Sequence, residues 1–238
     1  MILKDVKWTK NKYQELIDYL SKQVDLEYKE FNGNLLNSSK EVIGNNIPTL
    51  RKCALEISRG DYSGFIKLNT HKTFEETTIH GLIIGYLKLP IDNTIELLDE
   101  FVPFIDNWGT NDVCASNLKI FKCNQEKGYN YISKLLKTND PWKVRFGLAL
   151  LLSHYINEQY IDNVLNDCKE INIDHYYVKM GIAWLLSMCF VKYPDKTIKI
   201  IENKVLDKWT HNKTIQKIKE SLRVDKSTKD MLNTYKIK

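Results

Sequence analysis

Helix start and stop signals recur along almost the whole of this 238-residue chain, and they constrain its fold more than any other feature. Thr73 and Glu76 form a capping-box pattern before an apolar run. Pro48 suits the first turn of a helix, and Gly60 suits the position after its end. Strand-like alternation of apolar and polar residues is scarce. The sequence therefore predicts an all-α protein.

Most of the predicted helices are joined by short turns, and residues 37–47 are predicted to form a loop. The helices cover residues 9–23, 25–36, 48–59, 73–88, 93–104, 108–121, 125–138, 141–155, 158–170, 174–193, 194–204, 210–223 and 226–236. Neighbouring helices of this kind form αα-hairpins, and from residue 107 onward the hairpins recur at intervals of about 35 residues, as in HEAT-type repeats. Stacked hairpins would form an α-solenoid, whose concave side offers a long binding surface. We expect a single domain over residues 1–238; the alternative is a compact helical bundle.

Composition and motifs restrict the location and the chemistry. No apolar run approaches the ~20 residues that a membrane span needs, and the N-terminal residues do not resemble a secretory signal. The five cysteines are scattered and never spaced as CxxC, which favours a reducing cytoplasm and argues against a disulfide framework or a zinc site. The chain contains no P-loop, GxGxxG, GxSxG or HExxH motif.

The positive charge is concentrated at the C-terminal end. Residues 196–238 contain twelve Lys and Arg residues and five Asp and Glu residues, whereas the net charge of the whole chain is +5. Lys213, Lys217 and Arg223 fall along the predicted helix 210–223, which could run along the phosphates of a nucleic acid. The alternative is an ordinary solvated, lysine-rich helix surface.

Trp108 and Asp112 are the most informative pair of side chains. A spacing of four residues places both on one face of a helix, one turn apart. A tryptophan ring attracts positive charge through its quadrupole, and a carboxylate stabilises positive charge directly, so the pair suits a cationic, ring-shaped substrate. The alternative is a core tryptophan with an aspartate near a helix start.

Arg145 and Trp184 lie in strongly apolar helices. Only four of the 35 basic residues are arginines, so a retained arginine suggests a need for its planar five-donor group. Inside an apolar helix, Arg145 requires a charged partner or must face a groove; a structural ion pair with Asp140 or Asp112 is equally compatible with the sequence. For Trp184 the simplest interpretation is a core residue.

Taken together, five segments resemble the DNA alkylation repair proteins of HEAT-like fold, the bacterial alkylpurine DNA glycosylases of the AlkD type. The match covers residues 25–225, with the segments in the family's order and at about its spacing. The segments are Gly44-Asn-Asn-Ile-Pro-Thr-Leu-Arg51-Lys-Cys-Ala, Ile105-Asp-Asn-Trp108-Gly-Thr-Asn-Asp112, Trp142-Lys-Val-Arg145-Phe-Gly, Tyr177-Val-Lys-Met-Gly-Ile-Ala-Trp184 and Asn212-Lys-Thr-Ile-Gln-Lys-Ile.

This resemblance implies a right-handed α-solenoid that wraps alkylated double-stranded DNA in a basic concave face and removes 3-methyladenine and 7-methylguanine. It implies that Trp108 and Trp184 pack against the sugar–phosphate of the lesion, that Arg145 holds a phosphate, and that Asp112 lies near the anomeric carbon. Such a reaction needs no metal and no organic cofactor. We expect a monomer associated with the nucleoid. The predicted DNA-binding residues are Arg51, Lys52, Lys179, Lys213, Lys217 and Arg223.

The N-terminal segment departs from the family pattern. In the active glycosylases, a helix before the Gly-x-x-x-Pro turn helps to engage the lesion, but here residues 25–36 include Asn32-Gly33-Asn34, which weakens a helix. Three hypotheses therefore remain open. The chain is an alkylpurine glycosylase, a HEAT-like DNA-binding protein without excision activity, or a protein-interaction scaffold.

Overall fold

A computed structural model describes residues 2–36 and 38–238. These residues form helices and connecting turns, with an isolated bridge between Glu41 and Thr73. The predicted all-α class is confirmed. No helix in the part that the structure describes is long and apolar enough to cross a membrane. The chain divides into two compact units, residues 1–123 and 124–238, which we describe separately.

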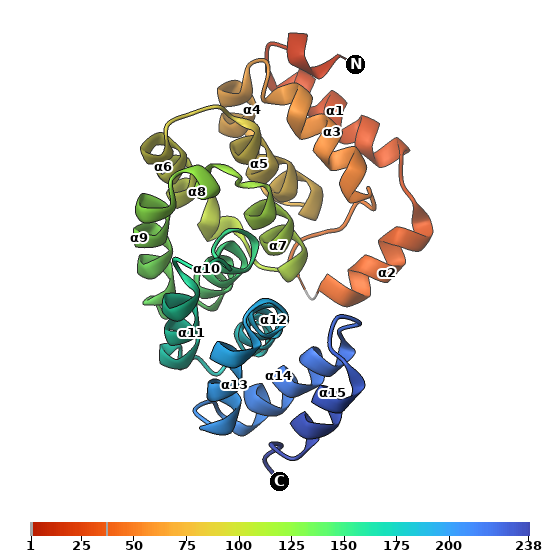
Figure 1. Cartoon of the computed structure of the whole chain (residues 1–238). Helices are drawn as coiled ribbons and strands as arrows, with labels where there is room; N and C mark the ends of the chain where they lie inside the picture. The colour runs from red at the N-terminus through yellow and green to blue at the C-terminus, as the bar shows by residue number, and fades with distance from the viewer. Residues whose placement is uncertain (1, 37) are drawn as a thin grey trace. The chain divides into compact units, whose positions relative to one another are not determined.

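The first unit is built around three helices that pack one after another (Figure 1). Helix α5 packs against both α3 and α7, while α6 packs on α5 and α1 packs on α4. Leu16, Leu50 and Leu82 lie in its buried core. Its helices are η1 (Leu3–Asp5), α1 (Lys10–Lys22), α2 (Leu26–Leu36), α3 (Ile47–Ile57), α4 (Tyr62–Leu68), α5 (Phe74–Tyr86), α6 (Ile91–Phe101), η2 (Val102–Phe104), α7 (Trp108–Asn117) and α8 (Ile120–Cys123).

In the second unit, α12 packs against both α10 and α14, α9 packs on α10, α11 and α13 pack on α12, and α15 packs on α14. Packing of alternate helices is characteristic of stacked helix hairpins, as in α-solenoids. The handedness, the concave face and the single domain over residues 1–238 stay predictions. The helices of this unit are α9 (Gln125–Leu136), α10 (Pro141–His154), α11 (Ile161–Glu170), α12 (Tyr176–Lys192), α13 (Pro194–Glu202), α14 (Lys208–Glu220) and α15 (Lys226–Asn233).

Three of the predicted helix starts agree closely with the structure because a side chain caps the helix. The Thr9 hydroxyl accepts a hydrogen bond from the backbone N–H of Lys12, and Thr73 forms the predicted capping box with Glu76. Asp140 accepts hydrogen bonds from the first turn of α10. These caps satisfy backbone N–H groups that have no partner within the helix.

Several predicted helices end a few residues earlier in the structure. The helix predicted over 108–121 stops at Asn117, and the one predicted over 210–223 stops at Glu220. At the second end, the Ser221 side chain accepts a hydrogen bond from the backbone N–H of Arg223 at 3.2 Å, a local bond that competes with helix continuation. Placing Arg223 on the same helix as Lys217 was therefore wrong. Helix α4, which follows an Asp61 cap, was not predicted at all.

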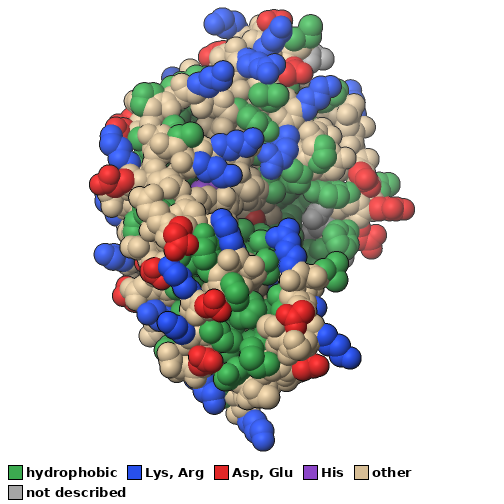
Figure 2. All heavy atoms as spheres, viewed as in Figure 1, with side chains coloured by type: hydrophobic (Ala, Val, Ile, Leu, Met, Phe, Trp, Pro, Cys, Tyr) green, Lys and Arg blue, Asp and Glu red, His purple; other side chains and the backbone are tan. Residues whose placement is uncertain are grey.

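Helix α2 forms despite its Asn-Gly-Asn sequence, and Figure 1 places it apart from α1 and α3. Leu26 is 75% exposed and Phe31 is 64% exposed. Figure 2 accordingly shows apolar side chains at the surface in the region of α2. The loop predicted over 37–47 begins at Asn37, outside the described residues, and continues to α3.

Two histidines, the half-buried His71 and the buried His80, lie beside η2, the short helix that precedes α7. The His71 Nε2 and His80 Nδ1 atoms lie 2.8 Å apart, and the His71 ring stacks on Phe104 with centroids 3.7 Å apart. Burial and the charge of Lys40 lower the pKa of His71 to about 4, against an opposing effect of Glu76. Burial and the neighbouring His71 lower the pKa of His80 to about 3. The folded state therefore keeps both rings neutral at pH values where an unfolded histidine is charged.

The His71–His80 pair predicts that the stability of the first unit falls in acid. Because both folded pKa values lie below the unfolded value near 6.5, the stabilising contribution is complete above about pH 6.5 and is lost as the pH falls towards 4 and 3. We expect the melting temperature of the wild type to fall by a few degrees between about pH 7 and pH 4.5. His71→Asn should show a smaller fall, because asparagine tolerates the backbone φ of 53° at this position but does not titrate. An equal fall in both proteins would contradict the assignment.

Candidate DNA-lesion site

Helix α7 carries the Trp108–Asp112 pair. The Asn107 side chain caps this helix by accepting a hydrogen bond from the Thr110 N–H at 2.8 Å, so Trp108 is the first helical residue. Because both Trp108 and Asp112 belong to α7, their spacing of four places them on one face of the helix. Both side chains are half-buried. An aromatic ring and a carboxylate are thus presented together at a partly exposed surface.

The end of α2 fixes the Trp108 ring. The Trp108 Nε1–H donates a hydrogen bond to the carbonyl oxygen of Leu35 at 3.1 Å. Beside it, a Cβ atom on Gly109 would lie only 2.5 Å from the Leu36 Cδ2 atom, so glycine permits close approach of the Leu36 side chain. Leu36 itself is buried. The N-terminal segment that departs from the family pattern therefore contacts the predicted catalytic helix directly.

A network of polar contacts holds the segment that leads into α7. One Asp106 carboxylate oxygen accepts hydrogen bonds from the hydroxyl groups of Ser38 and Ser39 and from the Ser39 N–H. Burial raises the pKa of Asp106, but hydrogen bonds from Asn107, Ser39 and Ser38 outweigh this effect, and the net shift is downward. Asp106 therefore stays ionised and ties the residues after α2 to the start of α7.

Arg51 contacts the opposite end of α7. Its Nη1 atom donates a hydrogen bond to the Asn117 side-chain oxygen at 3.0 Å, and the Asn117 side-chain nitrogen donates to the Leu82 carbonyl oxygen at 3.1 Å. Arg51 is half-buried, whereas Lys52 is exposed. A phosphate bound by Arg51 would share the guanidinium group with this structural contact.

Arg145 occupies a buried position between α10 and α12 in the second unit. Its side chain is only 5% exposed, and its Nη1 atom donates a hydrogen bond to the Tyr177 carbonyl oxygen at 2.9 Å. A Cβ atom on Gly181 would lie 3.1 Å from Nη1, so the glycine leaves room for the guanidinium group. The arginine is therefore fixed by the two helices that it joins.

Trp184 lies beside Arg145 and is not a core residue. The Arg145 Cζ atom is 5.8 Å from the centroid of the Trp184 ring, within the range of a cation–π contact. The ring is 37% exposed although most of α12 is buried. The core interpretation of Trp184 was therefore wrong, and the structure brings the two predicted site residues of this unit together.

A conservative substitution tests how Arg145 is held. We expect Arg145→Lys to lower the free energy of unfolding by about 1–2 kcal/mol, because lysine lacks the planar group that bonds to Tyr177 and contacts Trp184 at the same time. Arg223→Lys, at an exposed position in the same unit, is the matched control and should leave stability unchanged. Urea unfolding followed by circular dichroism measures both. Equal stability of the two variants would contradict the buried role of Arg145.

The remaining predicted DNA-binding residues have different surroundings. Lys179 forms ion pairs with Asp174 at 2.6 Å and Asp207 at 3.6 Å, so a phosphate would compete with two carboxylates for it. Lys217 forms an ion pair with Glu220 at 2.8 Å, while Arg223 is exposed after the end of α14. These carboxylate contacts could not be inferred from the spacing of the lysines alone.

The predicted site residues thus form two pairs. Trp108 and Asp112 share α7 in the first unit, and Arg145 contacts Trp184 in the second. That the two pairs together form one site stays a prediction. Sequence reasoning missed the Leu35 carbonyl, the Tyr177 carbonyl and Gly181, because each acts through the backbone and carries no side-chain signal of its own.

The helical architecture is that of a helical-repeat protein, and each of its two units carries one of the predicted pairs. A family model described as DNA alkylation repair enzyme matches residues 14–219. The chain belongs to this family, which gives it an enzyme role in DNA alkylation repair. A comparison with curated proteins found no match.

Proposed function

We propose that the protein is a monofunctional DNA glycosylase that removes positively charged N-alkylated purines, such as 3-methyladenine and 7-methylguanine, from double-stranded DNA. The observation that carries this proposal is the position of Asp112 one turn after Trp108, whose ring is fixed by the Leu35 carbonyl. The arrangement places a carboxylate and an aromatic face together on a partly exposed helix.

The proposed chemistry uses the charge of the lesion. Alkylation weakens the glycosidic bond, because the base leaves with the bonding electron pair and becomes neutral. The sugar then develops oxocarbenium character, which the Asp112 carboxylate and the Trp108 ring stabilise. Water adds to the anomeric carbon and releases a proton to Asp112. Arg145 would hold a flanking phosphate, with the exposed Trp184 ring against the sugar.

Release of methylated purines from alkylated duplex DNA tests this proposal. Radiolabelled methyl groups would be followed into free bases, with a reaction without protein as the control for spontaneous loss. We expect release of 3-methyladenine and 7-methylguanine above the spontaneous rate. Duplex binding without release would instead favour a DNA-binding member of the family that lacks excision activity.

A further inference from the structure

Two exposed aromatic side chains lie together on the second unit, outside the residues predicted for the lesion site. Tyr176 begins α12 and is 56% exposed, and Trp209 lies in the first turn of α14 and is 37% exposed. Their ring centroids are 5.6 Å apart at an angle of 61°, an edge-to-face contact. The contact stiffens the Trp209 ring while part of its surface stays open to solvent.

An open pocket of about 790 Å³ adjoins the Trp209 ring. Its volume falls in the range of small-molecule sites. Polar and basic side chains surround the tryptophan, so the pocket combines one aromatic wall with a hydrophilic rim. Besides Trp209, the residues that the argument uses are Asp207, Lys208, Asn212, Lys213 and Lys236.

The rim carries a positive charge. Lys208, Lys213 and Lys236 line the pocket, and the Lys213 Nζ atom lies 5.5 Å from the centroid of the Trp209 ring. The acidic group of the pocket, Asp207, caps α14 by accepting hydrogen bonds from two backbone N–H groups and also pairs with Lys179. The Asp207 charge is therefore offset by contacts that do not involve the three rim lysines.

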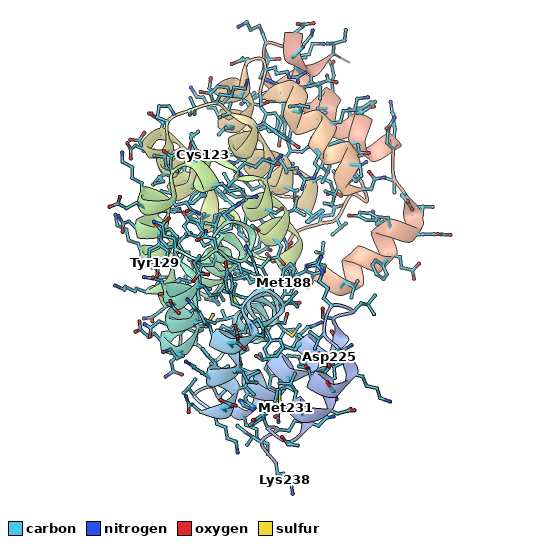
Figure 3. All side chains as sticks on the ribbon, in the orientation of Figure 1. Cys123, Tyr129, Met188, Asp225, Met231 and Lys238 are labelled. Carbon is cyan, nitrogen blue, oxygen red and sulfur yellow. The ribbon has the colours of Figure 1, made fainter. Side chains whose placement is uncertain are left out.

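The C-terminal tail is anchored beside this pocket. The Asn212 side-chain nitrogen donates to the Ile237 carbonyl oxygen at 2.9 Å, and the Asn212 side-chain oxygen accepts from the Ile237 N–H at 3.0 Å. A ring nitrogen of His211 lies 2.9 Å from the Tyr235 carbonyl oxygen. These bonds hold Tyr235 and Ile237 and thereby fix Lys236 between them. Figure 3 labels Lys238, the last residue of the chain. The tail thus adds a lysine to the rim.

We propose that this Trp209 pocket binds unpaired nucleotides of a single nucleic-acid strand, with a base stacked on Trp209 and the phosphates beside Lys208, Lys213 and Lys236. An open aromatic face can stack only on a base whose own face is uncovered, and in a duplex the neighbouring bases cover it. Aromatic faces bordered by lysines are the usual means of binding single strands without sequence preference. The proposal rests on the proposed action on DNA, but not on the chemistry of Asp112.

Fluorescence anisotropy with a labelled oligothymidylate of roughly eight nucleotides tests the site. We expect Trp209→Ala to weaken binding about tenfold or more, and Trp209→Phe to retain most of the affinity, because phenylalanine keeps an aromatic face. The Trp209→Ala substitution should weaken the binding of a blunt duplex of similar length much less. Circular dichroism would confirm that both variants fold, which is expected because Trp209 is partly exposed in the first turn of its helix.

Two lysine substitutions test the contribution of the positive rim to strand binding. Lys213→Ala should weaken single-strand binding and reduce the slope of log affinity against log salt by about one. The matched control is Lys196→Ala, because the Lys196 ammonium pairs with Glu158 and Asp162 and does not line the pocket. Oligouridylate of the same length distinguishes the two sources of an unpaired strand: tighter binding of oligothymidylate points to DNA, and tighter binding of oligouridylate points to RNA.

Three results would overturn the inference. These are no single-strand binding by the wild type, no effect of Trp209→Ala, or an equal loss of single-strand and duplex affinity in that variant. Base release measured on the same proteins shows whether the Trp209 inference or the proposed glycosylase function has failed. Base release without Trp209-dependent strand binding would remove only the inference, whereas strand binding that depends on Trp209 without base release would remove only the glycosylase.

Discussion

Replacing Asp112 with asparagine is expected to lower the rate of base release by roughly 10²- to 10³-fold while leaving duplex affinity little changed. Asparagine has nearly the shape of aspartate but carries no negative charge. The proposed role of Asp112 is to stabilise positive charge that grows as the glycosidic bond breaks, so its removal should affect the transition state more than the bound substrate. The effect should therefore appear in the single-turnover rate of release.

The surroundings of Asp112 make this substitution a clean test. The side chain is half-buried on a capped helix, and the change adds no volume and creates no cavity. The neighbouring Trp108 ring is held by a hydrogen bond to the Leu35 carbonyl, which the substitution leaves in place. We therefore expect the fold and the aromatic wall of the site to persist in the variant.

Asp99→Asn provides the matched control, because Asp99 is an exposed aspartate on α6 of the same unit. It removes one negative charge from the same unit and should leave release at the wild-type rate. Equal rates for Asp112→Asn and the wild type would exclude a catalytic role for Asp112. Equal losses in both variants would instead mean that the effect is not specific to Asp112.

The helical class and most helix starts could be predicted from the sequence because their signals are local. The Thr73 cap, the Asp140 cap and the four-residue spacing of Trp108 and Asp112 each depend on neighbours within one turn. The end of α14 was predicted three residues too late, because the deciding contact is a weak local bond from Arg223 to Ser221.

The surroundings of the site residues depend on contacts between distant parts of the chain. The Trp108–Leu35 bond joins residues 73 positions apart, and the Arg145–Tyr177 bond joins residues 32 positions apart. An apolar sequence around Trp184 predicts burial, but α12 leaves this ring exposed next to an arginine. Helical periodicity places residues on a face and does not say which faces stay uncovered.

A buried carboxylate on α5 provides the second prediction. Glu75 is fully buried, and its Oε1 atom accepts hydrogen bonds from the N–H groups of Gly44 at 2.7 Å and Asn45 at 3.1 Å. Its Oε2 atom accepts from the Ile43 N–H at 3.0 Å. One side chain therefore satisfies three consecutive backbone donors in the turn before α3. Such a concave set of N–H groups is a favourable environment for an anion.

The same turn joins three helices of the first unit. The Asn45 side chain donates hydrogen bonds to the carbonyl oxygens of Leu20 and Gln23 at the end of α1. Gly44 has a φ of 116°, and a Cβ atom there would lie 2.8 Å from the Lys29 Cβ atom on α2. Glu75 thus supports the connection between α1, α2 and α3 from a position on α5.

We expect Glu75→Ala to lower the free energy of unfolding by about 3–5 kcal/mol, because it leaves three buried N–H groups without their acceptor. Glu75→Gln keeps one side-chain oxygen but turns an NH₂ group towards a donor, so its cost should be smaller, about 1–3 kcal/mol. Glu96→Ala, at an exposed position on α6, is the control and should stay within about 0.5 kcal/mol of the wild type. Urea unfolding followed by circular dichroism orders the three variants. A loss below 1 kcal/mol in Glu75→Ala would mean that water or a rearranged turn replaces the carboxylate, and the turn would then not depend on α5.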